Sequence, residues 1–447
     1  MAMLAGCAVG PDYSKPAVQT PPAYKEAGEW VVAKPADAAP RGRWWQAFRD
    51  PVLDGLEEQV SVSNQSLKAS EAAHRQAVAE VQAARAQLFP TVGASASATR
   101  GRANATDARN YSISLDAGWE PDLWGRVRRL VESNRAAEEA SAADVEAVRL
   151  SLQAELATDY FQLRATDAGI ALLDDTIKAF QTSYTLTQNR YRAGVAAKVD
   201  VVQSETQLKS TQANALDLRA TRAQLEHAIA VLVGRPPGSF SIEPADVEAY
   251  VPSVPPGVPS TLLERRPDVA AAERRVAQAN AGIGVAEAAY YPSFDLTASG
   301  GAVGASIAHL ASAPTRVWSL GVAAAETLLD FGARGAEVAI ARAAYDEAVA
   351  NYRQTVLQAL QEVEDDLAAV HWLADEAVVQ EEATRAARES VALTLNQYKA
   401  GTVSFLNVVV VQAAQLSQDS ALVSLGARRL AASTALIRAL GGAWEAQ

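Results

Sequence analysis

The sequence predicts an α+β membrane protein in which short strands join very long helices, and in which this whole arrangement occurs twice. Three observations support the prediction. A segment at residues 186–194 returns 207 positions later at 393–401. Four segments alternate between apolar and other residues, and the long stretches between them repeat apolar residues every seven positions. A repeat of this length indicates an architectural unit rather than a local motif.

The repeat can be followed along both halves of the chain. Each copy of the segment ends in Ala-Gly, at Gly194 and Gly401, and Gly234 returns as Gly441. The predicted organisation has four parts, which are an N-terminal arm (1–50), a first repeat (51–234), a Pro-rich crossover (235–259) and a second repeat (260–447).

The N-terminal arm is irregular and rich in proline, so we expect it to lie on the surface of the body. Trp44, Trp45 and Phe48 near its end are expected to anchor it by packing. The chain's one cysteine closes the segment Leu4-Ala5-Gly6-Cys7, which matches the bacterial lipobox. We expect a covalent lipid on Cys7 and no other cofactor; an accidental cysteine in a flexible tail is the alternative.

Four segments show the two-residue period of strands that have two different faces. They lie at about 90–99, 111–119, 292–300 and 317–325, and a polar loop is expected at 100–110. Each is roughly ten residues long and carries aromatic residues near its ends, as strands that span a bilayer do.

The segments between the strands predict long helices. Residues 126–191 contain no proline and repeat apolar residues every seven positions from Leu156 to Tyr191, which is typical of coiled-coil packing. Such a helix is about 100 Å long. The corresponding helix of the second repeat is expected at 334–398, and the return helices are expected at 200–233 and 404–440. Shorter helices near 66–89 and 267–290 have the length needed to stack end to end with the return helices.

Four strands are too few to close a barrel, which needs about eight, and an open sheet edge is not tolerated in lipid. A membrane barrel built from this chain therefore requires several copies. The net charge of −12 argues against nucleic acid as a partner. The four histidines lack the spacing of a zinc site, and no nucleophile motif is visible, so we expect neither a metal site nor catalytic residues.

Several segments in this order resemble the TolC/OprM family of outer-membrane efflux factors, in its lipoprotein, NodT-like branch. They are Gly6–Tyr13, Trp44-Trp45, Asp122–Arg126, Leu262–Val269 and Leu440–Trp444. The resemblance implies a homotrimer with a 12-stranded outer-membrane β-barrel, four strands per chain, continuous with a long periplasmic α-helical barrel. It also implies an exit duct, not an enzyme, for drugs, metals or other small toxic compounds. A periplasmic adaptor and an inner-membrane pump, of the RND type, are the implied partners.

The resemblance places a gate near the two helical tips. Adaptor docking is expected at Tyr191, Arg192 and Gly194 in the first tip, and at Tyr398, Lys399 and Gly401 in the second. The periplasmic aperture is expected at Leu406, Asn407, Val410 and Asp200. Family members often place an Asp ring where this chain has Val410, so the expected constriction is apolar and closes by excluding water.

The sequence leaves two other interpretations of the whole chain. A duct for type I protein secretion has the same fold, but the lipobox and the Arg-Pro-Asp segment at 266–268 favour small-molecule efflux. A periplasmic coiled-coil adaptor or tether leaves the four alternating strands unexplained. The acidic stretch 362–366 either lines the lumen or forms a solvated helix face.

Overall fold

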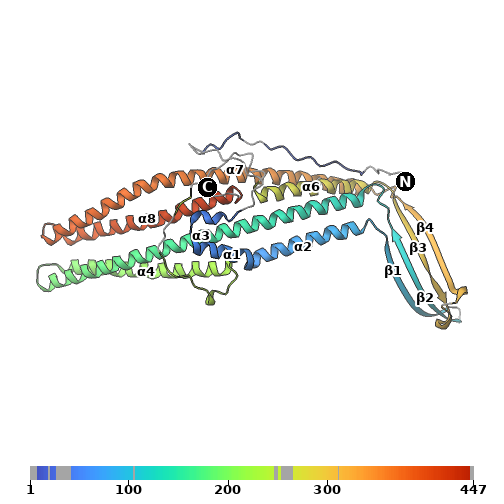
Figure 1. Cartoon of the computed structure of the whole chain (residues 1–447), viewed down its shortest axis with the longest axis horizontal. Coiled ribbons are helices and arrows are strands. Elements are labelled where there is room, and N and C mark those ends of the chain that lie inside the picture. Colours follow the sequence, from blue (N-terminus) through green and yellow to red (C-terminus); the bar gives the residue numbers. More distant parts are fainter. Residues whose placement is uncertain are drawn as a thin grey trace. The chain divides into compact units, whose positions relative to one another are not determined.

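The computed structural model describes residues 8–18, 21–26, 42–103, 106–245, 250–252, 265–310 and 312–442 (Figure 1). Cys7, the predicted site of lipid attachment, lies outside the described residues. The main elements follow in chain order, with a short 3-10 helix, η1 (Trp44–Phe48), before the first of them. They are α1 (Pro51–Ser63), α2 (Gln65–Ala86), β1 (Thr91–Ala103), β2 (Thr106–Trp119), α3 (Arg126–Arg192), α4 (Lys198–Leu232), α6 (Pro267–Ala288), β3 (Ser293–Gly304), β4 (Arg316–Ala325), α7 (Ala333–Lys399) and α8 (Phe405–Ala439).

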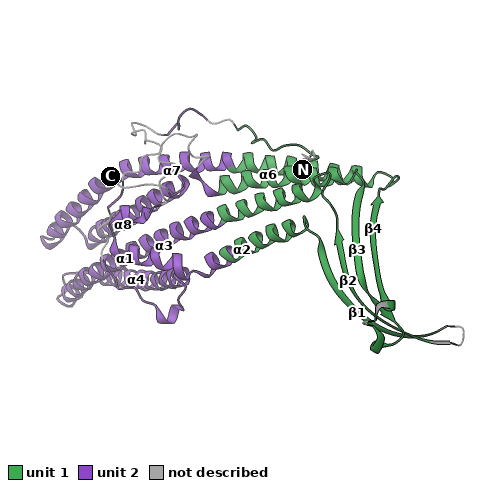
Figure 2. Cartoon of the chain, turned by 45° about the vertical axis from the view of Figure 1, so that its right-hand side comes forward, with its two compact units in different colours: residues 1–18, 71–144, 268–355 green, residues 19–70, 145–267, 356–447 purple. Residues whose placement is uncertain are grey.

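The chain divides into two compact units (Figure 2). The first contains residues 1–18, 71–144 and 268–355, and the second contains residues 19–70, 145–267 and 356–447. These units do not correspond to the two sequence repeats, because each unit takes elements from both halves of the chain.

The two repeats fold alike, element by element. Helices α3 and α7 each contain 67 residues, α4 and α8 each contain 35, and α2 and α6 each contain 22. The long helices begin and end at equivalent positions of the repeat, 207 residues apart. No described helix is both long enough and apolar enough to span a bilayer.

The first unit contains one antiparallel sheet with the strand order β1-β2-β3-β4. Its polar face carries ladders of serine, in which the Ser95 and Ser114 hydroxyls are 2.9 Å apart and those of Ser299 and Ser319 are 2.8 Å apart. The loop predicted at 100–110 is wrong for most of its length, since β1 continues to Ala103 and β2 begins at Thr106. Arginines replace the apolar residues on one face there, at Arg100, Arg102 and Arg109, and this hides the alternation.

The arm packs along this unit between residues 8 and 18. The Arg129 guanidinium donates to the carbonyls of Val9 and Gly10, at 3.0 Å each, and Asn280 Nδ2 donates to the Pro11 carbonyl at 2.9 Å. In the second unit the predicted aromatic anchor is confirmed. Trp44, Trp45 and Phe48 are buried, and the Phe48 ring centroid lies 4.8 Å from that of Phe161 in α3.

In the second unit, the C-terminus of each return helix meets the N-terminus of a shorter helix, as predicted from their lengths. Asn64 Nδ2, at the break between α1 and α2, donates to the Leu232 carbonyl at the end of α4 (2.8 Å). Arg266 Nη1 makes the equivalent bond to the Ala439 carbonyl at the end of α8 (3.2 Å). We call these two places the helix junctions. They occupy matching positions in the two repeats.

Each junction is closed by a glycine in the left-handed conformation. Gly234 has a φ of +71° and lies against the Ser63 carbonyl, and Gly441 has a φ of +87° and lies against the Arg265 carbonyl. Glycine reaches this conformation without the steric cost of a Cβ. A side chain at either position would also press on backbone, which cannot move aside as a flexible side chain does.

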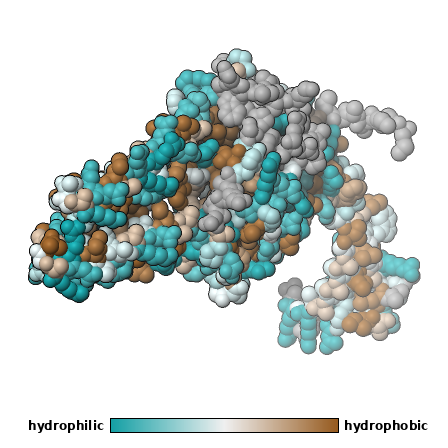
Figure 3. All heavy atoms as spheres, turned by 60° about the vertical axis from the view of Figure 1, so that its left-hand side comes forward, coloured by the Kyte–Doolittle hydropathy of each residue, from teal (hydrophilic) through white to brown (hydrophobic). Residues whose placement is uncertain are grey.

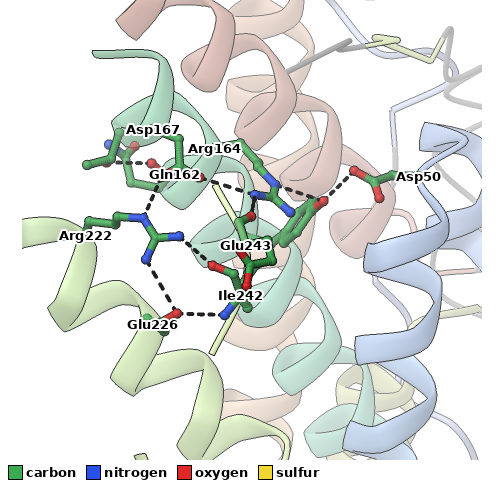
Figure 4. Close-up of polar contacts among 10 residues, drawn as sticks. Asp50, Gln162, Arg164, Asp167, Arg222, Glu226, Ile242 and Glu243 are labelled. Atoms are coloured by element: carbon green, nitrogen blue, oxygen red, sulfur yellow. Dashed lines mark hydrogen bonds and ion pairs between the residues drawn. The ribbon is translucent and has the colours of Figure 1, made fainter. Parts of the chain in front are cut away.

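A buried polar network ties the start of the crossover to α3 and α4 (Figure 4). Asp167 accepts from Arg164 Nη1 at 3.2 Å and from Arg222 Nε at 2.6 Å. The two guanidinium groups also donate to the carbonyls of Glu243 and Ile242, at 2.7 and 2.6 Å. Because the charges are paired and hydrogen-bonded, their burial is tolerated. Within the described part of the second repeat the network has no counterpart, and Ala374 stands at the position equivalent to Asp167.

The geometry of the glycines predicts that alanine variants at the junctions lose more stability than alanine variants at the tips. Gly234→Ala and Gly441→Ala should each destabilise the protein by roughly 3 kcal/mol, because the new Cβ adds a backbone clash to the unfavourable φ. Gly194→Ala and Gly401→Ala at the tips meet nothing within 4 Å, so only the conformational cost of about 1 kcal/mol remains. Thermal unfolding in detergent measures the four variants. Equal losses at the tips and the junctions would contradict a tight junction.

Candidate functional site at the helical tips

The two tips are built by the same backbone turn. At the end of α3 the Val195 amide donates to the Arg190 carbonyl and the Gly194 amide to that of Tyr191, both at 2.9 Å. At the end of α7 the Thr402 and Gly401 amides donate to the carbonyls of Gln397 and Tyr398, both at 3.0 Å. This is the Schellman arrangement, in which a left-handed glycine ends the helix. The structure places both predicted tip glycines in it, with φ of +78° at Gly194 and +76° at Gly401.

Arg190 connects the first tip to the second. Its guanidinium lies 4.6 Å from the centroid of the Tyr398 ring, and its Nη1 is 3.4 Å from the Tyr398 carbonyl oxygen. A cation above an aromatic face is attracted by the electron density of the ring. The sequence did not indicate this contact, because Arg190 and Tyr398 are 208 residues apart and neither residue is unusual for a helix end.

Tyr398 belongs to the core of its own hairpin. Its ring is 5% exposed and packs on Phe405 and Val408, which are also buried. The surface of this tip is therefore presented by Lys399 and Gly401, while Tyr191, Arg192 and Gly194 are exposed in the first tip. Adaptor docking at these residues stays a prediction.

The predicted aperture residues lie in the first turns of α4 and α8. Leu406 and Val410 are 50% and 59% exposed, an unusual position for large apolar side chains unless something else covers them. Asn407 is exposed between them, and Asp200 is half-buried at the equivalent position of α4. Leu406 and Val410 are four residues apart, so they share one face of α8.

A groove of about 880 Å³ runs between α4 and α8 behind the tips. Leu406 and Val409 of α8 line it together with Val199 and Val202 of α4. The structure thus brings Leu406 together with apolar residues of the first repeat, whereas Val410, Asn407 and Asp200 are not part of the groove lining.

The acidic stretch of α7 makes contacts within the chain. Glu362 forms an ion pair with Arg266 Nη1 at 2.7 Å. Glu364 accepts from the backbone amides of Lys25 and Glu26 in the arm, at 2.8 and 2.9 Å. These two carboxylates therefore bind other parts of the chain, which neither of the two sequence interpretations of this stretch had anticipated.

Two aspartates in equivalent positions of the repeat, Asp159 and Asp366, are half-buried. Burial, with the Glu155 carboxylate nearby, raises the pKa of Asp159 to about 6. Burial raises the pKa of Asp366 to about 7, with Glu362 and Asp365 adding to the effect and Arg438 and Arg266 opposing it. The sequence repeat indicates that Asp159 and Asp366 are equivalent, because they lie 207 residues apart.

No group of three or more His, Cys, Asp or Glu side chains within the described part of the chain is arranged to hold a metal ion. The features that stand out near the tips are apolar side chains, tight turns and the contact of Arg190 with Tyr398. Such a region suits a mechanical or permeation role.

The comparisons with known proteins agree with this geometry. The model of the outer membrane efflux protein family matches residues 56–235 and 258–442. The chain belongs to this family. It is an efflux protein of the outer membrane, and therefore a transport protein and not an enzyme.

Several relatives match over nearly their whole length. The probable efflux pump outer membrane protein TtgC of Pseudomonas putida is 30% identical over 100% of this chain and 94% of its own. The cation efflux system protein CusC of Escherichia coli is 25% identical over 99% and 97%. The solved structure of the outer-membrane channel OprN superposes with a TM-score of 0.89 and 31% identity, covering 98% of this chain and 99% of that one. The fold class predicted from the sequence is confirmed by these likenesses.

The raised pKa values predict how stability depends on pH. Because the folded pKa of Asp159 and Asp366 is above the unfolded value of 3.8, their contribution is complete below pH 4 and is lost as the pH rises through 6 to 7. Asp366→Asn and Asp159→Asn should therefore each stabilise the protein at pH 8, by ~1–2 kcal/mol after allowance for partial exposure.

The measurement is the unfolding temperature in detergent between pH 4 and pH 8. Asp217→Asn, at an exposed position of α4, is the control and should leave the pH profile unchanged. A wild-type profile that stays flat between pH 4 and pH 7 would refute the assignment.

Proposed function

We propose that three copies of this chain form a gated exit duct. Four strands per chain cannot close on themselves, whereas twelve strands from three chains can. In this arrangement the apolar face of each sheet lies in the outer membrane and the serine-rich face lines the passage. The long helices continue the duct into the periplasm, towards an adaptor and an inner-membrane pump of the RND type.

The exposed apolar pair Leu406 and Val410 supports the placement of the gate. Around a three-fold axis each residue would recur as a ring, and an apolar ring can exclude water and ions without a physical plug. Asp200 and Asn407 would add polar groups at the same level. The contact between Arg190 and Tyr398 holds the two hairpins of one chain together, and engagement of an adaptor at the tips would compete with it.

Small toxic molecules are the cargo we propose. Relatives that match the whole chain are named as efflux pump proteins for toluene, antibiotics and solvents, and CusC as a cation efflux protein. Secretion of whole proteins by the same fold is the alternative. The names of these relatives favour small solutes over whole proteins.

The gate predicts a gain in conductance when it is made polar. Trimers of Leu406→Ser and Val410→Ser, inserted in planar bilayers, should conduct several times more current than wild type, because a polar ring stays wet. Arg190→Met should act in the same direction by releasing the tips. Leu216→Ser changes an exposed leucine of α4 about 24 Å from Asp200 and serves as the control. If the two gate variants conduct like wild type, the constriction lies elsewhere.

The lipid anchor is a separate proposal that rests on the sequence around Cys7. Cys7→Ser should remove a covalently bound fatty acid that is detectable by mass spectrometry of the purified protein, while the trimer still assembles in the outer membrane. An unmodified Cys7 in the wild-type protein purified from its own membranes would exclude the anchor.

A further inference from the structure

The apolar face of the sheet ends in a repeated pair of residues. In β2, Arg109 lies two residues before Tyr111 in the chain and nearer to the hairpin end. In β4, Arg316 lies two residues before Trp318 in the same way. The two pairs stand 207 residues apart, at equivalent positions of the repeat. Side chains two residues apart in a strand lie on the same face, so each arginine lies on the face of its aromatic partner.

This face is the one without the serine ladders. It carries Ile113 and Leu115 in β2 and Leu320 and Val322 in β4, which are between 54% and 75% exposed, and Trp318 is 79% exposed. In Figure 3 apolar residues run along the sheet, at the lower right. An exposed apolar face of this size requires a cover, and membership of an outer-membrane family makes lipid that cover.

The spacing along β2 comes near the ~25 Å height of the apolar band of membrane barrels. Trp119 and Tyr111, at the two ends of the apolar stretch, are eight residues apart, which is about 27 Å along the strand and ~20 Å of depth at the tilt usual in barrels. Arg109 lies two residues, or about 7 Å, beyond Tyr111. The aromatic rings therefore stand at the edge of the hydrocarbon and the arginines stand in the headgroup layer.

The hairpin ends lie opposite the ends at which α2, α3, α6 and α7 join the strands. If the helices extend into the periplasm, as proposed above, the hairpin ends and their arginines reach the outer leaflet.

The end of β1 and β2 carries three arginines on this face, and Asp107 stands opposite Arg102 in the register. Arg100 stands directly opposite Arg109 in the register of the two strands, and Arg102 lies on the same face as Arg100. Arg100 and Arg102 have other interactions within the chain, so Arg109 and Arg316 are the residues on which the site depends. Arg109 and Arg316 each stand beside an aromatic residue on the apolar face, and this pairing suits an anionic headgroup attached to an acyl chain.

We propose that Arg109 and Arg316 bind the phosphate groups of a phosphorylated glycolipid in the outer leaflet. A guanidinium binds phosphate through two parallel hydrogen bonds, while the aromatic ring beside it packs on the top of the acyl chains. Two such sites per chain give six around a trimer. The proposal depends on the orientation of the sheet in the proposed duct, and it adds a ligand that the duct function does not require.

The test compares lipid binding by wild type and by Arg109→Gln/Arg316→Gln. Trimers in phosphatidylcholine nanodiscs receive bisphosphorylated lipid A, and native mass spectrometry counts the bound molecules. Each site loses one arginine in the double variant, so at about 1 kcal/mol per arginine each site should bind lipid A roughly fivefold more weakly. Arg109→Lys/Arg316→Lys keeps the charges but not the paired hydrogen bonds, and should lie between the two.

Arg75→Gln/Arg385→Gln removes the same charge from exposed helix positions and should bind lipid A like wild type. Phosphatidylglycerol, which carries a phosphodiester, should bind more weakly than lipid A, and inorganic phosphate should not displace lipid A. The inference is overturned if the Gln variant binds lipid A as wild type does, if the helix control loses as much affinity, or if inorganic phosphate competes equally.

Conductance in planar bilayers separates this inference from the proposed duct. Arg109→Gln/Arg316→Gln should conduct like wild type, because the arginines lie outside the passage, and a normal conductance also shows that the variant is folded. If the double variant conducts normally and still binds lipid A as wild type does, the proposed lipid site is wrong and the proposed duct stands. If the wild-type trimer binds lipid A but carries no current, the proposed duct is wrong.

Discussion

The helix junctions are the constraint on which the rest of the helical architecture depends. A return helix of 35 residues and a second helix of 22 replace one continuous helix beside a partner of 67 residues. Two shorter helices can take the place of one long helix only if their ends meet without a gap. A left-handed glycine allows the approach, and one side-chain amide or guanidinium satisfies a helix-end carbonyl that would otherwise have no partner.

The two repeats keep this geometry and differ in chemistry. Asn64 and Arg266 make the same bond in the two junctions with different side chains, and only the first repeat has the buried network around Asp167. At the tips the backbone turn is identical, but the helix that follows begins with Lys198 in one repeat and with Phe405 in the other. The shared geometry forms the scaffold, and the differences make the second hairpin more apolar at its tip, where the gate is proposed.

Much of the fold was predictable because its signals are long and periodic. The seven-residue step and the absence of proline place the long helices to within one or two residues of their observed ends. The strands were predicted too short, because Arg100, Arg102 and Arg109 replace the apolar residues that mark the outer face. One of these arginines, Arg109, belongs to the proposed lipid site. Leu406 and Val410 could be found from a family resemblance, whereas the contact between Arg190 and Tyr398 could not, since it depends on how two hairpins meet in space.

The serine ladders on the polar face of the sheet also bear on how solutes move. A wall of hydroxyls already bonded to one another, with glycines at Gly93, Gly118 and Gly321 on the same face, offers a passing molecule few free donors and no aromatic surface on which to adsorb. In the proposed duct, residence times at this wall would therefore be short for solutes of very different chemistry. Selection between compounds would then occur before they enter the duct, and the strand-lined exit itself would have little selectivity.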